Sequence, residues 1–266
     1  RKGDETLLNA LNDALAKLQD NGELKAIYAR WQLPELTTPG VDASGADAPR
    51  AEMDQAQLWL FLKGAWITLV ISFLAMALAV PLGLGLALAR LYGGKVTSFC
   101  AQAYVEAFRG TPVLLQLYIL YYGLAPIVHL SAFAAAILGL GMNYGAYEAE
   151  VHRAALQSIP VGQSEAAAAL GLSRAQSLRL VLLPQALRTA LPAMTNDLIA
   201  LLKDSSLVSV ITVVELTKQM TITAVDVRSW AVPGALCALL YFLMSYPLAR
   251  LAARLEAKLA AGGEPA

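Results

Sequence analysis

Seven polar residues stand within otherwise apolar stretches of the sequence, where they could bind a solute. Polar and ionisable side chains are costly in hydrocarbon, so they mark candidate substrate paths. Carboxylates and amides supply acceptors, amides and an ammonium group supply donors, and a zwitterionic amino acid needs both. These residues could instead hold helices together, since Glu148 and Glu150 are close enough to Arg153 to pair with it. The candidates are Gln116, Asn143, Glu148, Asn196, Asp197, Lys203 and Asp204.

The sequence lacks the residue patterns that ATP binding, metal binding, catalysis and nucleic-acid binding require. There is no G-x-x-x-x-G-K-[ST] phosphate loop, so we do not expect this chain to bind ATP. His129 and His152 are predicted at opposite membrane faces, and no Cys/His group has metal-ligand spacing. Neither a nucleophile–base arrangement nor a basic, aromatic-rich nucleic-acid patch is recognisable. We therefore expect no catalytic residue, no metal site and no nucleic-acid partner.

The elements that carry the polar candidates read as membrane helices. Of 266 residues, 57% are hydrophobic and 15% charged, which is typical of a membrane protein. The uncharged run 65–89 can cross a hydrocarbon core of about 30 Å. The prediction is an all-α membrane helical bundle of about five transmembrane helices. The predicted spans are residues 65–89, 111–124 with 105–109 leading in, 131–153, 178–210 and 229–249.

Small residues within two of these spans indicate where helices could approach closely. Ala75, Ala79, Gly83 and Ala87 form a stripe at every fourth position of the first span. Gly141 and Gly145, beside Asn143, have the spacing of a close helix crossing.

Basic residues predict the orientation of the bundle. Lys and Arg accumulate on the cytoplasmic side of membrane proteins. The connection 126–130 carries neither and falls on the other side. The amino terminus is therefore predicted outside and the carboxyl terminus in the cytoplasm. The residues that fall on the cytoplasmic side are Arg90, Lys95, Arg153, Arg174, Arg179, Arg250, Arg254 and Lys258.

Outside the spans, the sequence divides into three further segments. Residues 1–33 read as an amphipathic helical hairpin, with leucines at helical spacing and a stop at Asn21-Gly22. Residues 34–57 are rich in Pro, Gly, Ala and Ser and predict a flexible linker. The transmembrane domain is then 58–258, and 259–266 is a disordered tail.

The stretch 159–185 reads as a short helix, a stop and a restart. Pro160 suits the first helical turn, and an Ala-rich run from Glu165 favours helix. Gly171 can adopt the left-handed conformation that ends a helix. Ser173 and Gln176 form a capping box for the next one. Such a knob between two apolar segments could dock into a groove of another protein.

This stretch resembles the cytoplasmic loop of ABC importer permeases. The similarity lies in Glu165-Ala166-Ala167, Gly171 and Leu183-Pro184 at the family's spacing, with Gly162 shortly before. The resemblance implies a type I ABC importer permease architecture in the bacterial inner membrane. It also implies that these residues couple to cytoplasmic ATPase subunits, which bind ATP and Mg²⁺. A second permease subunit, either a copy or a close paralogue, would complete the path.

A second set of residues resembles the polar amino-acid permeases. The set includes Lys203-Asp204 and, as a structural signature, Glu106, Arg109, Gly110, Thr111 and Pro112. The resemblance implies a polar amino-acid substrate. Gly110 and Pro112 predict a sharp re-entry into the membrane, where Arg109 meets lipid phosphates or Glu106. A plain interfacial loop with a snorkelling arginine is the alternative.

Residues 1–33 are similar to the C-terminal end of the amino-acid-binding proteins that serve these importers. The resemblance implies an extracytoplasmic binding domain fused to the permease, and the start at Arg1 is expected of a fragment. An amphipathic helix lying on the membrane is the alternative. For the whole chain, an ion-coupled secondary transporter or channel would use the same intramembrane acids, and a membrane-embedded enzyme is a third possibility.

Overall fold

The computed structural model describes residues 5–25 and 53–261, and these residues form helices without any strand. Two compact units are present, residues 1–49 and 50–266, each described by itself. In the first unit, α1 (Glu5–Asp20) confirms the predicted amphipathic helix and ends at a turn where Gly22 has a φ of +75°. Its leucines at 7, 8, 11 and 15 are exposed. A second helix starts at Glu23, and the rest of the predicted hairpin lies outside the described residues.

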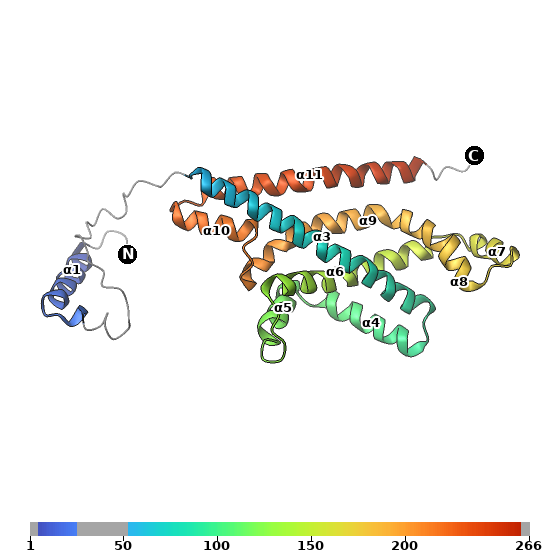
Figure 1. Cartoon of the computed structure of the whole chain (residues 1–266), viewed down its shortest axis with the longest axis horizontal. Helices are drawn as coiled ribbons and strands as arrows, with labels where there is room; N and C mark the ends of the chain where they lie inside the picture. The colour runs from blue at the N-terminus through green and yellow to red at the C-terminus, as the bar shows by residue number, and fades with distance from the viewer. Residues whose placement is uncertain (1–4, 26–52, 262–266) are drawn as a thin grey trace. The chain divides into compact units, whose positions relative to one another are not determined.

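The second unit is built on the crossing of α3 (Gln55–Tyr92) and α6 (Ala132–Gln157) (Figure 1). The predicted small-residue stripe is buried, with Ala75, Ala79 and Ala87 fully inaccessible. A Cβ atom at Gly83 would lie 2.5 Å from the Cβ of Glu148, so only glycine permits this approach. Asp54 caps α3 in a capping box, so residues 55–57 are helical and the predicted linker end at 57 is wrong.

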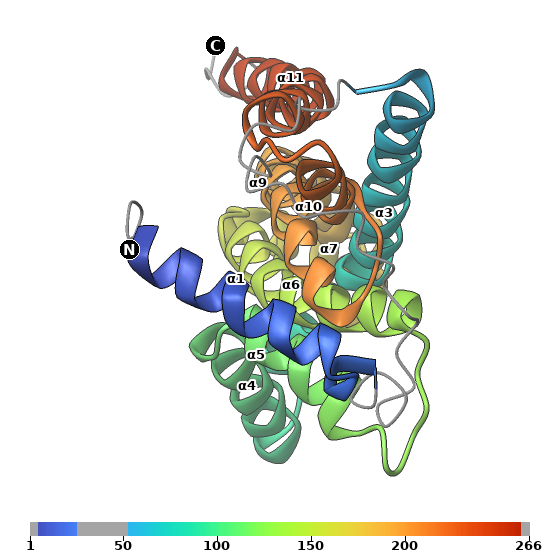
Figure 2. The same ribbon diagram turned by 90° about the vertical axis from the view of Figure 1, so that its left-hand side faces the viewer.

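Two helices lie where the second span was predicted. The amphipathic α4 (Lys95–Gly110) precedes α5 (Val113–Tyr118), which continues as the π-helix η2 (Ile119–Gly123). The predicted span 111–124 thus coincides with the apolar helix 113–123, and its predicted lead-in 105–109 belongs to α4. Polar residues on one side of α4 hide it from a hydropathy search, and α5 with η2 is only about 16 Å long. Figure 2 shows α6 between α4 on one side and α9 on the other.

The helix–stop–restart reading of 159–185 is confirmed. α7 (Val161–Ala169) ends at Leu170, and Gly171 follows with a φ of +77°. The Ser173–Gln176 capping box opens α8 (Arg174–Ser177), then the π-helix η3 (Leu178–Leu182) leads into α9 (Leu183–Asp204). The proline in the first turn of α9 disturbs the helix as predicted. Pro160 caps α7 from outside rather than standing in its first turn.

The remaining segment contains one helix that the sequence did not predict. After the 3₁₀ turn η4 (Ser205–Ile211), α10 (Leu216–Asp226) starts at Glu215, which is fully buried. Glu215 accepts hydrogen bonds from the backbone of Thr217 and Lys218 and from the hydroxyl of Tyr241 on α11 (Ala231–Ala261). This carboxylate therefore joins α10 to α11. Because α11 continues to residue 261, the predicted tail from 259 starts too early.

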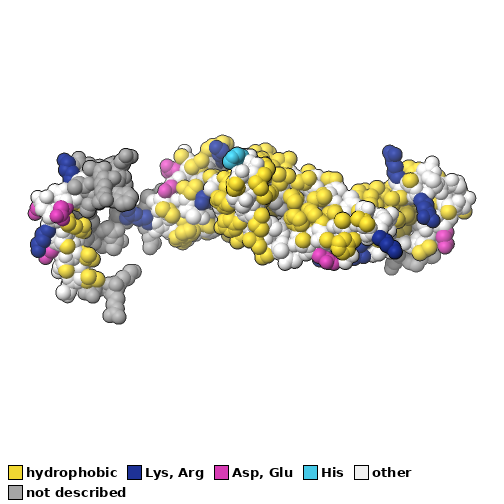
Figure 3. Space-filling model, turned by 90° about the horizontal axis from the view of Figure 1, so that it is seen from below, with side chains coloured by type: hydrophobic (Ala, Val, Ile, Leu, Met, Phe, Trp, Pro, Cys, Tyr) yellow, Lys and Arg dark blue, Asp and Glu magenta, His cyan; other side chains and the backbone are white. Residues whose placement is uncertain are grey.

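By length and composition, α3 and α11 are the two described helices apolar enough to cross a membrane. The others combine apolar faces with polar ones. Hydrophobic side chains cover much of the middle of the second unit on the face in Figure 3, and several Lys and Arg side chains gather at its right-hand end. The C-terminal ends of α3 and α11 and the α7–α8 loop lie at that same end (Figure 1).

Candidate functional site

A cavity of about 450 Å³ lies among α4, α5, α6 and α9. It combines a guanidinium, a carboxylate, an amide and two phenol rings. The bend between α4 and α5 forms one wall, α6 a second, and the last turns of α9 a third. The lining residues are Arg109, Gly110, Thr111, Pro112, Val113, Asn143, Tyr144, Tyr147, Ala200 and Asp204.

Arg109 lines the cavity from the last turn of α4, and the residue is exposed. It stands at the end of α4, about 21 Å along that helix from its start. Its Cζ atom is 5.2 Å from the centre of the Tyr147 ring, a cation–π contact. Its charge also acts on Asp197. The expected pairing with Glu106 is wrong, since Glu106 faces outward and accepts a hydrogen bond from Gln102 at 2.7 Å.

Gln116 and Asn143 hold the bend between α4 and α5. The carbonyl oxygen of Phe108 accepts hydrogen bonds from Gln116 Nε2 at 2.9 Å and from Asn143 Nδ2 at 3.1 Å. Gln116 also donates to both oxygens of Thr111 and accepts from Asn143. Pro112 has no N–H and interrupts the helical ladder, so these amides stabilise backbone that the helix leaves unpaired. Of the two, Asn143 lines the cavity.

The other polar candidates on α9 point in different directions. Asp204 lines the cavity and accepts a hydrogen bond from Tyr144 at 2.8 Å. Lys203 is exposed on another side of the helix. Asn196 donates to Glu256 on α11 at 3.3 Å, which places it away from the cavity. The sequence predicted that Asn196, Lys203 and Asp204 line one substrate path. In the structure only Asp204 of these three residues lines the cavity.

Two buried titratable groups, Glu148 and His152, and the half-buried Asp197 lie beyond the cavity. Glu148 is fully buried against Gly83, and its Oε2 is 3.6 Å from Nε2 of His152, which is 2% exposed. The charge of Asp197 acts on Glu148 from α9. Both oxygens of Glu148, Nε2 of His152 and Oδ2 of Asp197 have no hydrogen-bond partner among the described residues. His152 is thus buried between helices.

The expected pairing with Arg153 holds for one glutamate and fails for the other. Glu150 binds Arg153 at 2.6 Å and also Arg90 of α3. Glu148 lies on the other side of α6, which turns about 100° per residue, and so faces His152 instead.

The loop residues form a second cluster at the end of the bundle. In α7, Ala167 is buried, while Gly162, Glu165 and Ala166 are exposed. A cavity of about 810 Å³ separates α7 and α8 from the end of α3, and Glu165 lines it. No atom lies within 4 Å of where a Cβ would stand at Gly162 or Gly171. Leu183 and Pro184 begin α9. The exposed face of α7 is free to contact another protein.

The sequence did not predict Tyr144 and Tyr147 as site residues, and it placed Arg109 and Thr111 in a structural signature rather than in the substrate path. One signal was available, because Tyr147 and Asn143 are spaced four apart and share a helix face. No residue group able to hold a metal ion occurs within 5–25 and 53–261.

Comparison with known proteins gives consistent matches. The model of the binding-protein-dependent transport system inner membrane component family matches residues 79–261. The chain is 37% identical over 216 residues to the glutamine transport system permease protein GlnP of Escherichia coli (strain K12), covering 77% of this chain and 99% of GlnP. It is 40% identical over 182 residues to the probable amino-acid ABC transporter permease protein YckA of Bacillus subtilis (strain 168), covering 68% of this chain and 80% of YckA.

Solved structures share the fold. An amino acid ABC transporter with histidines matches with a TM-score of 0.70 and 36% identity, covering 78% of this chain and 100% of that one. The MetNI methionine ABC transporter matches with a TM-score of 0.65 at 24% identity, covering 77% and 99%, and this likeness concerns the fold alone.

Proposed function

From the premise that this chain belongs to the family of binding-protein-dependent transport system inner membrane components and is the permease subunit of an ABC importer, we propose that it carries polar amino acids. The observation that carries the proposal is the cavity of about 450 Å³ with opposite charges on two walls. Arg109 can bind a carboxylate, and Asp204 can bind an ammonium group. An α-amino acid presents both.

The geometry supports particular roles. A guanidinium offers a planar fork of donors that fits a carboxylate in two places. Asp204 keeps one oxygen bonded to Tyr144, which orients the carboxylate. Asn143 supplies an amide, and Tyr144 and Tyr147 supply walls for a side chain. Asp197 and Glu148 lie one turn further along α9 and α6, and two acids there favour neutral or cationic substrates over acidic ones.

The loop 162–184 supports the coupling role. ATP hydrolysis, with its Mg²⁺, is expected on a separate cytoplasmic ATPase subunit that contacts the exposed face of α7. Movement of α7 would change the tilt of the bundle between outward-open and inward-open states. Such coupling requires two sites that bias one two-state element. In this chain Glu165, Ala166 and Gly171 are exposed where such a partner would bind.

The assembly and orientation extend the same proposal. We expect a second permease subunit, either a copy of this chain or a close paralogue, and an extracytoplasmic amino-acid-binding domain fused before the linker. The amino terminus lies outside and the carboxyl terminus in the cytoplasm. The support for this orientation is the gathering of basic residues at the end that carries the α7–α8 loop.

ATP hydrolysis in proteoliposomes tests the proposal. The vesicles contain this chain and the ATPase subunit, and polar amino acids are added singly. Stimulation by one or a few of them supports both transport class and substrate class. ATPase binding without stimulation by any amino acid would remove the substrate assignment. No ATPase binding would remove the coupling role.

A further inference from the structure

The loop helix α7 is attached to the bundle at few points. Its one buried side chain is Ala167, at 2% exposure. Among the described residues, a single side-chain hydrogen bond joins α7 to another helix: Gln185 Nε2 of α9 donates to Gln163 Oε1 at 3.2 Å. Glu165 makes no ion pair in the same part of the chain. This hydrogen bond is therefore the specific polar link between the loop and α9.

Gln185 is fixed at its other contact as well. The same Nε2 donates to the backbone oxygen of Val181 at 2.9 Å. An amide nitrogen carries two protons, so both are used. Val181 belongs to the π-helix η3, and Pro184 has no N–H to give to the ladder. The side chain therefore bridges the irregular turn and ties it to α7.

The opposite side of α7 is open. The cavity of about 810 Å³ lies between α7 and the end of α3, and it is lined by Tyr92 and Gly93 on one side and Ser164 and Glu165 on the other. A displacement of α7 is thus not passed to α3 by direct packing there. The helix α7 instead contacts η3, and its side-chain hydrogen bond, through Gln163, is with α9.

The first turn of α9 leads to the central cavity. Ala200 and Asp204, near the other end of the helix, line that cavity. They lie about 22 and 28 Å from Gln185 at roughly 1.5 Å per residue. α9 is continuous over this length, with Pro192 inside it, so a tilt of its first turn moves the helix that forms the cavity wall.

We propose that Gln185 is a positioning residue for transport, which connects α7 through Gln163 to the cavity-lining helix α9. This inference rests on the proposed function, because α7 must be moved by an ATPase. It concerns the hydrogen bond between two glutamines, not the docking of the loop itself.

The test measures substrate uptake and ATP hydrolysis together, in proteoliposomes with the full chain and its ATPase subunit. Gln163→Leu leaves the Gln185–Val181 bond intact and lies on an exposed surface, so folding is not at stake. It is expected to retain ATPase binding and hydrolysis while transport per ATP falls at least about fivefold, the factor of one net hydrogen bond. Gln185→Leu should do the same, and the double variant should be no worse than either single one.

Two further variants complete the design. Gln163→Glu keeps an acceptor for Gln185 and should restore most of the transport lost in Gln163→Leu. Thr195→Ala removes a side chain that donates to the backbone of Leu191 within α9, away from Gln185, and should leave transport per ATP unchanged. Unchanged coupling in Gln163→Leu, or losses that multiply in the double variant, would overturn the inference. Failure of the wild-type chain to bind the ATPase would instead overturn the proposed function.

Discussion

Arg109 combines a cation with an aromatic face at the edge of the central cavity. Its guanidinium carbon stands 5.2 Å from the centre of the Tyr147 ring, and Asp204 lines the same cavity. A cation–π contact uses the plane of the guanidinium and leaves the N–H edge free. That edge is the part that binds a carboxylate. The tyrosine therefore holds Arg109 in place without consuming its donors.

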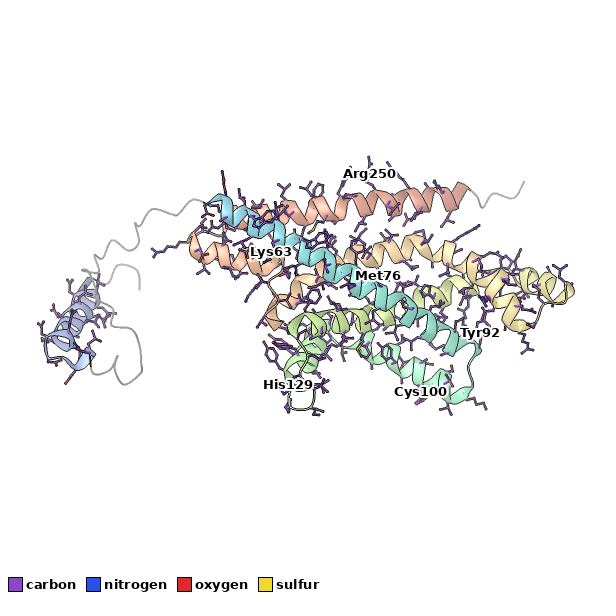
Figure 4. The ribbon with its side chains drawn as sticks, viewed as in Figure 1. Lys63, Met76, Tyr92, Cys100, His129 and Arg250 are labelled. Carbon is purple, nitrogen blue, oxygen red and sulfur yellow. The ribbon has the colours of Figure 1, made fainter. Side chains whose placement is uncertain are left out.

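Replacing Arg109 should weaken uptake far more than replacing another exposed cation. A charge-assisted hydrogen bond contributes about 1.5–3 kcal/mol, so Arg109→Gln should lower substrate uptake about 10- to 100-fold. The measurement is initial uptake rate in proteoliposomes. Lys63→Gln, an exposed site on α3, is the matched control and should transport normally (Figure 4). Equal uptake by the two variants would contradict a role for Arg109 in binding.

The buried carboxylate of Glu215 depends on the hydroxyl of Tyr241 from another helix. That hydroxyl lies 3.0 Å from Glu215 Oε2 and also 3.0 Å from Thr217 Oγ1. Tyr241→Phe should lower the free energy of unfolding by about 1–3 kcal/mol, because it leaves a buried acceptor short of a donor. Thermal unfolding in detergent measures this loss. Tyr246→Phe on the same helix, at an exposed tyrosine, should have little effect. Identical midpoints would show that the Glu215 network does not stabilise α11.

At the scale of elements, the α3–α6 crossing and the loop 159–185 are determined by different physical factors. The crossing is a contact of small residues: Gly141 packs against Leu78, Gly145 against Leu82, and Gly83 against Glu148. Side chains there set how closely the backbones approach. The loop, by contrast, is defined by local backbone conformations, chiefly the left-handed Gly171. The crossing therefore depends on side-chain packing, whereas the loop depends on backbone conformation.

Glycine-to-alanine substitutions separate packing from helix propensity in α3. Alanine usually stabilises a helix interior by about 0.5–1 kcal/mol relative to glycine. Gly85→Ala, where nothing lies within 4 Å of the new Cβ, should therefore raise the unfolding temperature slightly. Gly83→Ala places Cβ 2.5 Å from Glu148 Cβ and 2.8 Å from Ala149 N, so it should lower that temperature. A rise in both variants would mean that α3 and α6 are further apart than described.

A substitution in the loop should affect transport without affecting the bundle. Gly171→Asp forces a side chain into a φ of +77° and adds charge to the exposed loop. Uptake should be blocked while the protein still assembles in the membrane, as measured by uptake and by size-exclusion chromatography. Gly94→Asp, at the N-cap of α4, where φ is −67° and aspartate is favourable, is the matched control. Normal uptake by Gly171→Asp would count heavily against a docking role.

At the scale of the whole transmembrane unit, the positions of basic residues and the exposure of apolar helices both fit a membrane environment. The apolar part of α11 is only 11% buried, so most of its surface is available to lipid or to another subunit. The loop with α7 lies at the end where α3 and α11 finish, and the 124–130 connection lies elsewhere (Figures 1 and 4). A bundle with its basic loops at one end has a preferred orientation in a membrane.

Cysteine labelling checks the orientation. In a background with Cys100 and Cys237 replaced by serine, His129→Cys should react with a membrane-impermeant thiol reagent added outside intact cells. Arg174→Cys, on the α7–α8 side, should react only after the membrane is permeabilised. His129 and Arg174 are both exposed in the structure, so accessibility within the protein does not limit either reaction. The reverse pattern would invert the proposed topology.

The sequence by itself determined what depends on neighbouring residues. Gly171 ends a helix because of its own φ, and Ser173 with Gln176 starts one through bonds three residues apart. The long apolar runs of α3 and α11 predict membrane helices by their length alone. The small-residue stripe of α3 predicts the face on which it contacts another helix. These features are local, or repeat at the helical period, and need no knowledge of partners.

Only the tertiary structure decided which polar residues meet. The amphipathic α4 places Arg109 at the edge of a cavity to which α6 and α9 bring Tyr147 and Asp204. The side chain of Gln116 stabilises the backbone bend between α4 and α5, and the side chain of Glu148 faces His152. The cost of a buried polar group depends on the partners it finds, and those partners come from segments far apart in the chain. No local pattern encodes such distances, which is why the fold could be predicted from sequence while the cavity could not.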